Sequence, residues 1–150
     1  PCALGRGGIT ARKREGDGAT PRARMAALAG RLRADRGIRP FIQGTFWERI
    51  DPTDGWCDAP CTVNYNRPVR LPFAYSHETM QRSDHLYDRV IILDWNVRKR
   101  VQGLGSAIFL HQARIENGQW KPTEGCVALE ASTFAKLMPQ LSRLRGLQVL

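Results

Sequence analysis

Two residues in the second half of the chain, His111 and Cys126, have types that can work together in nucleophilic catalysis. A cysteine attacks well only as a thiolate, and since its ordinary pKa is about 8.5, a neighbouring group must take its proton. A histidine within hydrogen-bond reach can do this and later return the proton to a leaving group. Gly125 precedes the cysteine and permits a tight turn whose backbone N–H groups stay clear to bond a developing oxyanion. These residue types indicate acyl transfer by a cysteine nucleophile.

Each of the two residues also has a simpler interpretation. A cysteine that follows a glycine is more often a small buried hydrophobe. A histidine at the end of a strand is often no more than a hydrogen-bonded surface residue. The residue types alone therefore leave the catalytic interpretation open.

The other cysteines are Cys2, Cys57 and Cys61, and four cysteines in 150 residues are too few for a disulfide scaffold. Cys57 and Cys61 could form a bridge only if a turn brought them together. Their C-x₃-C spacing also lies within the range of zinc sites, with His77 or His85 as further ligands. These histidines are not placed as in a zinc finger, so we expect no metal.

The apolar pattern predicts the elements that must position His111 and Cys126. Residues 86–95 contain a β-branched apolar run and predict a buried strand. Residues 106–111 predict a second apolar strand, which ends on the histidine. Residues 112–125 predict a polar loop that is long enough to lead back to a neighbouring strand.

Three further segments complete the expected fold. Residues 22–40 predict a basic helix, and residues 51–72, with four prolines, predict a long irregular segment of a kind that is usually functional. After Cys126 we expect a helix with Ser132 as its N-cap. Its buried face would consist of apolar residues at helical spacing, namely Phe134, Leu137, Met138, Leu141 and Leu144. The mixture predicts a mainly β fold, β-rich α+β with a few helices.

The length of 150 residues suits one domain with its own core, and we expect residues 1–150 to form a single domain. No apolar run approaches the ~20 residues of a membrane helix, so we expect no transmembrane segment. The chain opens on Pro1 instead of Met, from which we expect residues upstream to have been removed or omitted.

The formal net charge of +9 is unevenly distributed. Residues 1–40 carry ten Lys or Arg and three Asp or Glu, a difference of +7, and the rest of the chain contributes +2. Nucleic acid, a membrane surface or an anionic cell-wall polymer would each suit a basic patch, and so would a face that only aids solubility. No known nucleic-acid-binding pattern accompanies the charge, so we expect no nucleic acid. A basic nucleic-acid-binding module remains the non-enzyme alternative.

The segments around the candidate pair match a known pattern. SAIFLHQAR, a loop and PTEGCVALE together resemble the active-site segment of L,D-transpeptidase catalytic domains, the YkuD-like family. Those domains have a His, a loop of similar length, then Ser/Thr-His-Gly-Cys and an apolar residue. The matching positions here are His111, Thr123, Gly125, Cys126 and Val127. The resemblance spans nearly the whole chain, because similar segments lie elsewhere: CALGRGGI, KREGDGATP, WCDAP, YNRPVRLP and LYDRVIILDWN.

The resemblance implies a largely β fold, in which two mixed sheets form a sandwich with peripheral helices. It implies that Cys126 attacks a carbonyl of a peptidoglycan donor stem peptide, with His111, oriented by a backbone carbonyl, as base and then acid. The N–H groups of Gly125 and Cys126 would form the oxyanion hole. An amine of a neighbouring stem would resolve the thioester as a 3–3 or 1–3 cross-link, and carbapenems would acylate the cysteine. The implied location is the periplasm or bacterial cell envelope, and no cofactor is implied.

The sequence departs from the family pattern at Ala23, Glu124 and Ala128, where the family has Gly, His and often Arg or Asn. The donor carries carboxylates, and Ala128 cannot pair with one, so we expect another cationic donor in the site. Arg114 follows His111 by three residues and is the first candidate, because a guanidinium can grip a carboxylate with two bonds. The further residues that we expect to bind substrate are Arg67, Tyr65, Thr123 and Glu124.

Hydrolysis at the same Cys-His site is the nearest alternative activity. Water in place of the acceptor amine would make the chain an L,D-carboxypeptidase or an amidase. The choice of acceptor depends on the shape of the pocket, and the sequence does not separate these activities.

Overall fold

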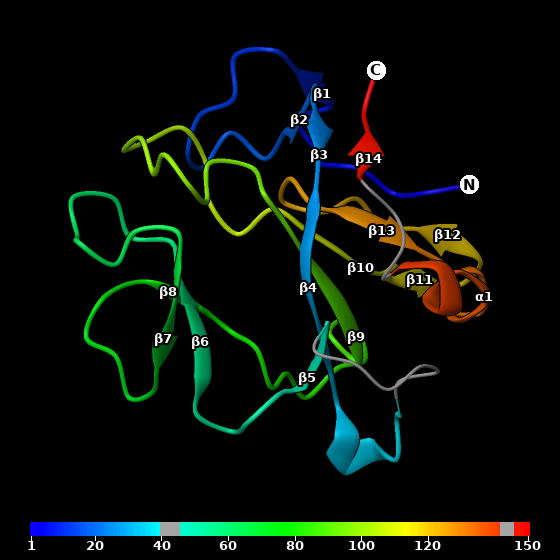
Figure 1. The fold of residues 1–150 in the computed structure, drawn as a ribbon. Coiled ribbons are helices and arrows are strands. Elements are labelled where there is room, and N and C mark those ends of the chain that lie inside the picture. Colours follow the sequence, from blue (N-terminus) through cyan, green and yellow to red (C-terminus); the bar gives the residue numbers. More distant parts are fainter. Residues whose placement is uncertain (40–45, 142–145) are drawn as a thin grey trace.

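A five-stranded sheet forms the centre of the computed structural model, which describes residues 1–39, 46–141 and 146–150 (Figure 1). Its strand order is β13 (Val127–Leu129), β10 (Phe109–Gln112), β9 (Arg89–Leu93), β4 (Ala27–Leu32) and β5 (Trp47–Arg49). The pairs β10–β13 and β4–β5 are parallel, and β9 runs antiparallel to both of its neighbours. The sheet is therefore mixed.

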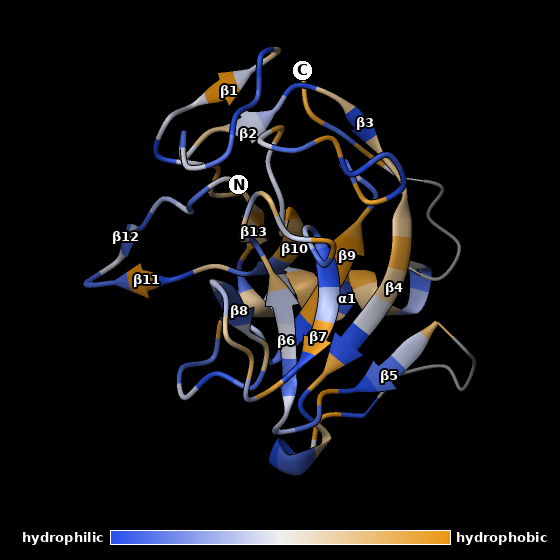
Figure 2. Cartoon of the chain, turned by 90° about the vertical axis from the view of Figure 1, so that its left-hand side faces the viewer, coloured by the Kyte–Doolittle hydropathy of each residue, from blue (hydrophilic) through white to orange (hydrophobic). Residues whose placement is uncertain are grey.

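The two strands that lead to the candidate site lie where the sequence predicts them. Four consecutive residues of β9, Val90 to Leu93, are buried, as expected for a central strand with β-branched side chains covered on both faces. All of β10, including His111, is buried. Figure 2 shows this part of the sheet as a strongly apolar band. The strand predicted in residues 86–95 is confirmed as β9. The strand predicted in residues 106–111 is confirmed only from Phe109 onward: Ser106 to Ile108 form a loop with a left-handed backbone at Ala107, and β10 continues past His111 to Gln112.

A second, three-stranded sheet has the order β7 (Arg67–Arg70), β6 (Asp54–Cys57) and β8 (His77–Thr79), all antiparallel. It faces the central sheet through a buried apolar cluster that joins Trp56 to Val90, Phe109 and Cys126. The prediction that residues 51–72 are irregular is thus wrong for two stretches, because backbone pairing across the sheet forms strands despite unfavourable residue types.

The other face of the central sheet is covered by α1 (Ala131–Leu141), which is opposite the three-stranded sheet in Figure 1. The helix predicted after Cys126 is confirmed, and Phe134 and Met138 are buried as expected, with Leu137 partly buried. Ser132 lies inside the helix instead of capping it, because the helix already begins at Ala131. The side chain of Leu141 and all of Leu144 lie outside the described residues.

The helix predicted over residues 22–40 is wrong. Its described part forms β3 (Arg24–Met25), β4 and a short 3-10 helix, Ala34–Arg36. Strand β4 pairs with both β9 and β5, so tertiary contacts override the helical preference of its Ala and Leu residues. Gly30 lies so close to Trp47 that an added Cβ would be 2.4 Å from the indole ring, and the glycine is thus required by sheet packing.

Short paired segments complete the fold. Strands β1 (Ile9–Thr10) and β2 (Thr20–Pro21) are parallel, β3 pairs with β14 (Leu147–Gln148), and β11 (Ile115–Glu116) and β12 (Gln119–Trp120) form a hairpin within the predicted 112–125 loop. The described chain is thus β-rich with a peripheral helix, which confirms the predicted mainly β fold.

Replacing Phe134 with alanine is expected to lower the free energy of unfolding by about 3–5 kcal/mol, the usual cost of emptying a buried aromatic site. The ring is fully buried between α1 and the central sheet. Urea unfolding at equilibrium measures the change. Lys136→Ala, on the exposed side of the same helix, is the control and should stay within about 0.5 kcal/mol of the parent. Equal midpoints for the two variants would contradict the packing described for α1.

Candidate active site

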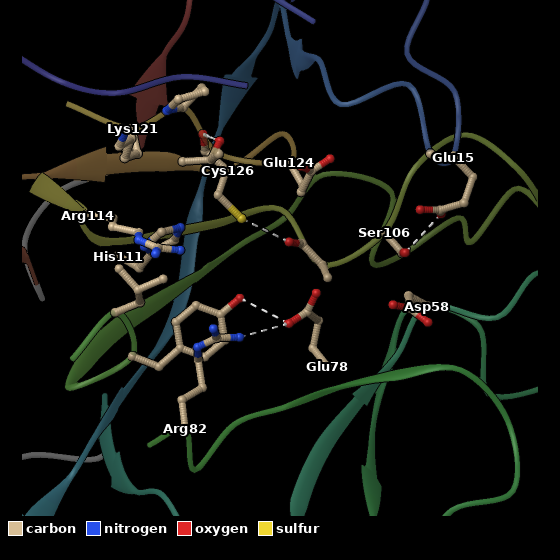
Figure 3. Close-up of a pocket in the computed structure, with 16 residues that line it drawn as sticks. Glu15, Asp58, Glu78, Arg82, Ser106, His111, Arg114, Lys121, Glu124 and Cys126 are labelled. Carbon is tan, nitrogen blue, oxygen red and sulfur yellow. Dashed lines mark hydrogen bonds and ion pairs between the residues drawn. The ribbon is translucent and has the colours of Figure 1, made fainter. Parts of the chain in front are cut away.

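Cys126 and His111 are brought to one face of the sheet by the parallel pairing of β10 with β13. Leu110 is opposite Val127 and His111 is opposite Ala128, which places Cys126 beside Phe109, two residues before the histidine. Side chains alternate along a strand, so Phe109, His111 and Cys126 all point to the same side. Both candidate residues line one pocket, with a cavity of about 360 Å³ (Figure 3).

The Cys126 thiol is nearly enclosed, with only 8% of the residue exposed. Its S–H donates to the carbonyl oxygen of Ala107 at 3.2 Å, and the Phe109 N–H donates to Sγ at 3.3 Å. Burial raises the pKa of Cys126 to about 12, and the bond from Phe109 opposes this rise. The resting nucleophile is therefore a neutral thiol, with one backbone N–H in place to stabilise the thiolate.

His111 is also buried and neutral. Its Nδ1 lies 2.7 Å from the carbonyl oxygen of Gln112, and because a carbonyl oxygen only accepts, Nδ1 carries the proton. Nε2 is then the nitrogen that can act as a base. Burial lowers the pKa of His111 to about 4, and the edge of its ring meets Tyr87 at 5.3 Å between centroids. Proton transfer requires the thiol hydrogen to turn from the Ala107 carbonyl toward the imidazole.

The turn before the nucleophile is held by Thr123. Its hydroxyl donates to the carbonyl oxygen of Cys126 at 2.7 Å and accepts from the N–H of Gly125 at 3.1 Å. Gly125 has φ +135°, and an added Cβ would lie 2.9 Å from the carbonyl oxygen of Ala19, so this position excludes side chains. An oxyanion could use the Gly125 N–H only in exchange for its bond to Thr123.

The N-terminal segment supports the same turn. Ala3 pairs with Ala128, and the fully buried Thr20 accepts from the Gly5 N–H at 2.8 Å while its hydroxyl lies 3.4 Å from the carbonyl oxygen of Cys126. Ala128 is fully buried between this segment and β10, so the structure has no room there for the larger residue that the family pattern often has.

The charged groups of the pocket are separated by sign (Figure 3). Arg114 and Lys121 lie on the side of His111, and Glu15, Asp58 and Glu78 lie on the other side of Cys126. Burial raises the pKa of Glu78. Within the described residues, Oδ1 of Asp58 is buried and has no hydrogen-bond partner. The pocket can therefore hold a ligand that is anionic at one end and cationic at the other.

Arg82 lies between the two charged sides. Its guanidinium is 3.8 Å from Glu78 and stands over the Tyr87 ring at 5.2 Å from the centroid. The Tyr87 hydroxyl lies 3.5 Å from Glu78, and the ring itself contacts His111. Arg82 and Tyr87 thus connect the acidic wall to the candidate base.

A scan against protein-family models matches residues 1–143 to the YkuD family, described as the L,D-transpeptidase catalytic domain. The chain belongs to this family. The resemblance seen in the sequence is thereby confirmed, and the domain is a catalytic one whose family acts on peptidoglycan. A search of curated proteins and a search of solved structures returned no match.

The remaining predicted substrate-binding residues of this L,D-transpeptidase-family chain occupy different places. Glu124 and Arg114 line the pocket and are largely exposed, with ion pairs to Arg6 and Glu116. Tyr65 is fully buried outside the pocket wall, where its hydroxyl bonds to Glu15. Arg67 is exposed on β7 and does not line the pocket.

Sequence reasoning missed five charged residues of the pocket: Glu15, Asp58, Glu78, Arg82 and Lys121. Glu15, Asp58 and Lys121 come from three separate segments of the chain. Glu78 and Arg82 are four residues apart, but this spacing alone does not indicate a pocket. One signal was available, because Asp58 lies in the proline-rich stretch that was expected to be functional.

The zinc alternative finds no support in the described residues, where no group of three or more His, Cys, Asp and Glu could hold a metal ion. Cys57 is buried and Cys61 is exposed, and both are free thiols. Within the same residues, no helix is long and apolar enough to cross a membrane.

Proposed function

We propose that the chain is a cysteine-dependent peptidoglycan L,D-transpeptidase. The observation that carries this proposal is the placement of Cys126, directly before β13, and of His111, on β10, in the lining of one pocket, in a chain of this family. The donor is a stem peptide, attacked at the bond between an L centre and a D residue. The acceptor is an amine of a neighbouring stem, and the product is a 3–3 or 1–3 cross-link.

The reaction would proceed in two steps with balanced proton transfers. Nε2 of His111 takes the thiol proton of Cys126 while Sγ attacks the donor carbonyl carbon. The tetrahedral intermediate collapses to a thioester, and the imidazolium gives its proton to the departing amine of the D residue. The acceptor arrives as an ammonium and first gives one proton to a carboxylate of the pocket. The free amine then attacks the thioester and loses a second proton to His111, which returns it to the leaving thiolate.

The charge separation in the pocket favours an amine as acceptor over water. Arg114 and Lys121 share one carboxylate, that of Glu116, so together they keep a positive charge that suits a carboxylate of the stem peptides. The carboxylates of Glu15, Asp58 and Glu78 suit a group that arrives as an ammonium. Hydrolysis would need no acidic subsite for the acceptor, because water carries no charge. An L,D-carboxypeptidase or amidase at the same cysteine remains the second candidate.

Incubation with purified tetrapeptide muropeptides, followed by mass spectrometry, tests the proposed function. A transpeptidase produces dimers and releases the terminal D residue, whereas a carboxypeptidase releases it without dimers. Monomers that remain intact throughout would contradict both. In this proposal the protein acts in the periplasm or cell envelope, and carbapenems acylate Cys126 and add their mass to the intact protein.

The basic N-terminal region does not support a nucleic-acid-binding module. Several of its cations are already paired within the protein: Arg6 with Glu124, Lys13 with Asp17, Arg31 with Glu48, Arg33 with Asp35 and Arg36 with Asp88. Charges neutralised in this way attract a polyanion less strongly. Strongly salt-dependent binding to random DNA would be the result that revives this alternative.

Arg114→Ala is expected to reduce kcat/KM by roughly 10- to 150-fold, because a hydrogen bond to a charged group contributes about 1.5–3 kcal/mol. Steady-state cross-linking rates measure the loss. Arg70→Ala is the matched control: it is also an exposed arginine in an ion pair, with Asp54, but it lies outside the pocket. If the two variants lose activity equally, Arg114 does not bind the donor carboxylate.

A further inference from the structure

Asn66 is a fully buried polar residue that the reaction steps above do not use. It has 0% exposed surface and a left-handed backbone conformation, with φ 54°. Its place is the connection between β6 and β7, directly after Tyr65. A buried amide is costly unless its polar atoms are bonded, so the partners of this side chain indicate its role.

The Asn66 side chain joins three segments of the chain. Oδ1 accepts from the indole N–H of Trp56 at 2.9 Å and from the backbone N–H of Ala107 at 3.1 Å. Nδ2 donates to the carbonyl oxygen of Trp95 at 3.1 Å. One amide therefore fixes β6, the turn after β9 and the loop before β10 relative to one another.

Ala107 is the partner that connects Asn66 to the thiol. It has φ 51°, a left-handed conformation that is unfavourable for a non-glycine residue and therefore needs support from its surroundings. Its N–H is held by Asn66, and its carbonyl oxygen is the acceptor of the Cys126 S–H at 3.2 Å. If Ala107 relaxed to a negative φ, this carbonyl would turn away from the thiol.

We propose that Asn66 is a positioning residue for the nucleophile, because it holds Ala107 in the conformation that directs its carbonyl to the thiol of Cys126. The resting thiol is then kept protonated and oriented in the pocket until the proton is drawn to His111. The inference rests on the proposed role of Cys126 as nucleophile. It connects the three-stranded sheet to the nucleophile through Ala107, because Asn66 belongs to the β6–β7 connection.

Asn66→Gly is the variant that tests this role. Glycine adopts φ 54° without strain, so the substitution removes the side-chain bonds and leaves the backbone free to keep its course. The measurement is the rate of Cys126 alkylation by iodoacetamide as a function of pH, followed by peptide mapping in a Cys2→Ser, Cys61→Ser background that removes the exposed thiols. Muropeptide cross-linking is measured in parallel.

The expected result is a change of opposite sign in the two measurements. Loss of the S–H acceptor favours the thiolate, so alkylation at pH 8 becomes roughly 3- to 10-fold faster and its pH profile moves to lower pH. Cross-linking kcat/KM falls at least about 10-fold, because the sulfur is no longer held in place. Asn66→Ser, whose side chain ends one bond short of Oδ1, should move both quantities in the same directions and serves if the glycine variant does not fold.

Asn96→Gly is the matched control. Asn96 has φ 53° and its side chain also makes three bonds, to Val101 and Gly105, but none to Ala107. Its alkylation profile and cross-linking should stay within about 2-fold of the parent. An unchanged pH profile in both Asn66 variants, or an equal shift in Asn96→Gly, overturns the proposal. The alkylation measurement stands even if the chain makes no cross-links, so failure of the proposed function is recognised separately.

Discussion

Cys126→Ala is expected to abolish cross-linking and to remove covalent labelling by a carbapenem such as meropenem, while the fold stays intact. The thiol is the group that would form the thioester, and it lies in the pocket beside His111. Intact-mass measurement after meropenem treatment shows the labelling, and muropeptide analysis shows the turnover. Circular dichroism and urea unfolding check the fold, since loss of one sulfur from a buried site is a small change in packing.

The other cysteines provide the controls. Cys2 and Cys61 are exposed, and Cys57 is buried beside Thr62, at 3.5 Å from its hydroxyl. Replacement of each by serine should leave the chemistry unchanged. Cross-linking by the Cys126→Ala protein would show that another group is the nucleophile, and the proposed mechanism would then be wrong.

His111→Ala is expected to reduce the acylation rate by roughly 10²- to 10⁴-fold, the usual contribution of a positioned general base. Because the pKa of His111 is lowered to about 4, the base of the free enzyme stays neutral down to that pH. The acid limb of kcat/KM should therefore lie near pH 4, and it should vanish in the variant. A pH–rate profile that is the same in both proteins would count decisively against this role for the histidine.

The same residue makes the stability depend on pH. In the folded chain the His111 pKa is about 4, below its ordinary value of 6.5. The unfolded chain therefore takes up a proton first as the pH falls. Above about pH 6.5 His111 is neutral in both states, so its protonation does not change the free energy of unfolding. Between about pH 6.5 and 4 the free energy of unfolding falls by about 1.4 kcal/mol for each unit by which the pH is lowered. His111→Ala should lack this component, which urea midpoints at pH 7 and 5 would reveal.

The sequence predicted those parts of the fold that local pattern determines. Strand β9 contains the apolar, β-branched run Val90–Leu93, and β10 begins with the apolar pair Phe109–Leu110. The length and composition of such runs favour buried strands. Strand β4 could not be predicted, because Ala, Leu and Gly favour no strand and its identity comes from β9 and β5 far along the chain. The strands β6 and β7 contain turn residues, and they form because β6 pairs with both β7 and β8.

The candidate pair could be predicted because both residues lie at strand ends on one short stretch of chain. Their hydrogen bonds could not, since the contact between Cys126 and Ala107 depends on a left-handed backbone at an alanine, which no local signal indicates. The acidic wall was missed for a similar reason. Glu15, Asp58 and Glu78 are ordinary surface-type residues in sequence, and only the meeting of separate loops makes them one side of a pocket.

The pairing of Ala3 with Ala128 and of Gly5 with Thr123 affects the order in which the chain folds. These contacts close nearly the whole chain into a loop, and the loss of chain entropy on such a closure slows its formation. During synthesis, the segment around Gly5 must wait until residues 123–128 have emerged before it finds its partners. The cysteine turn is thus among the last structures to be completed, and a partly made chain carries no finished reactive centre.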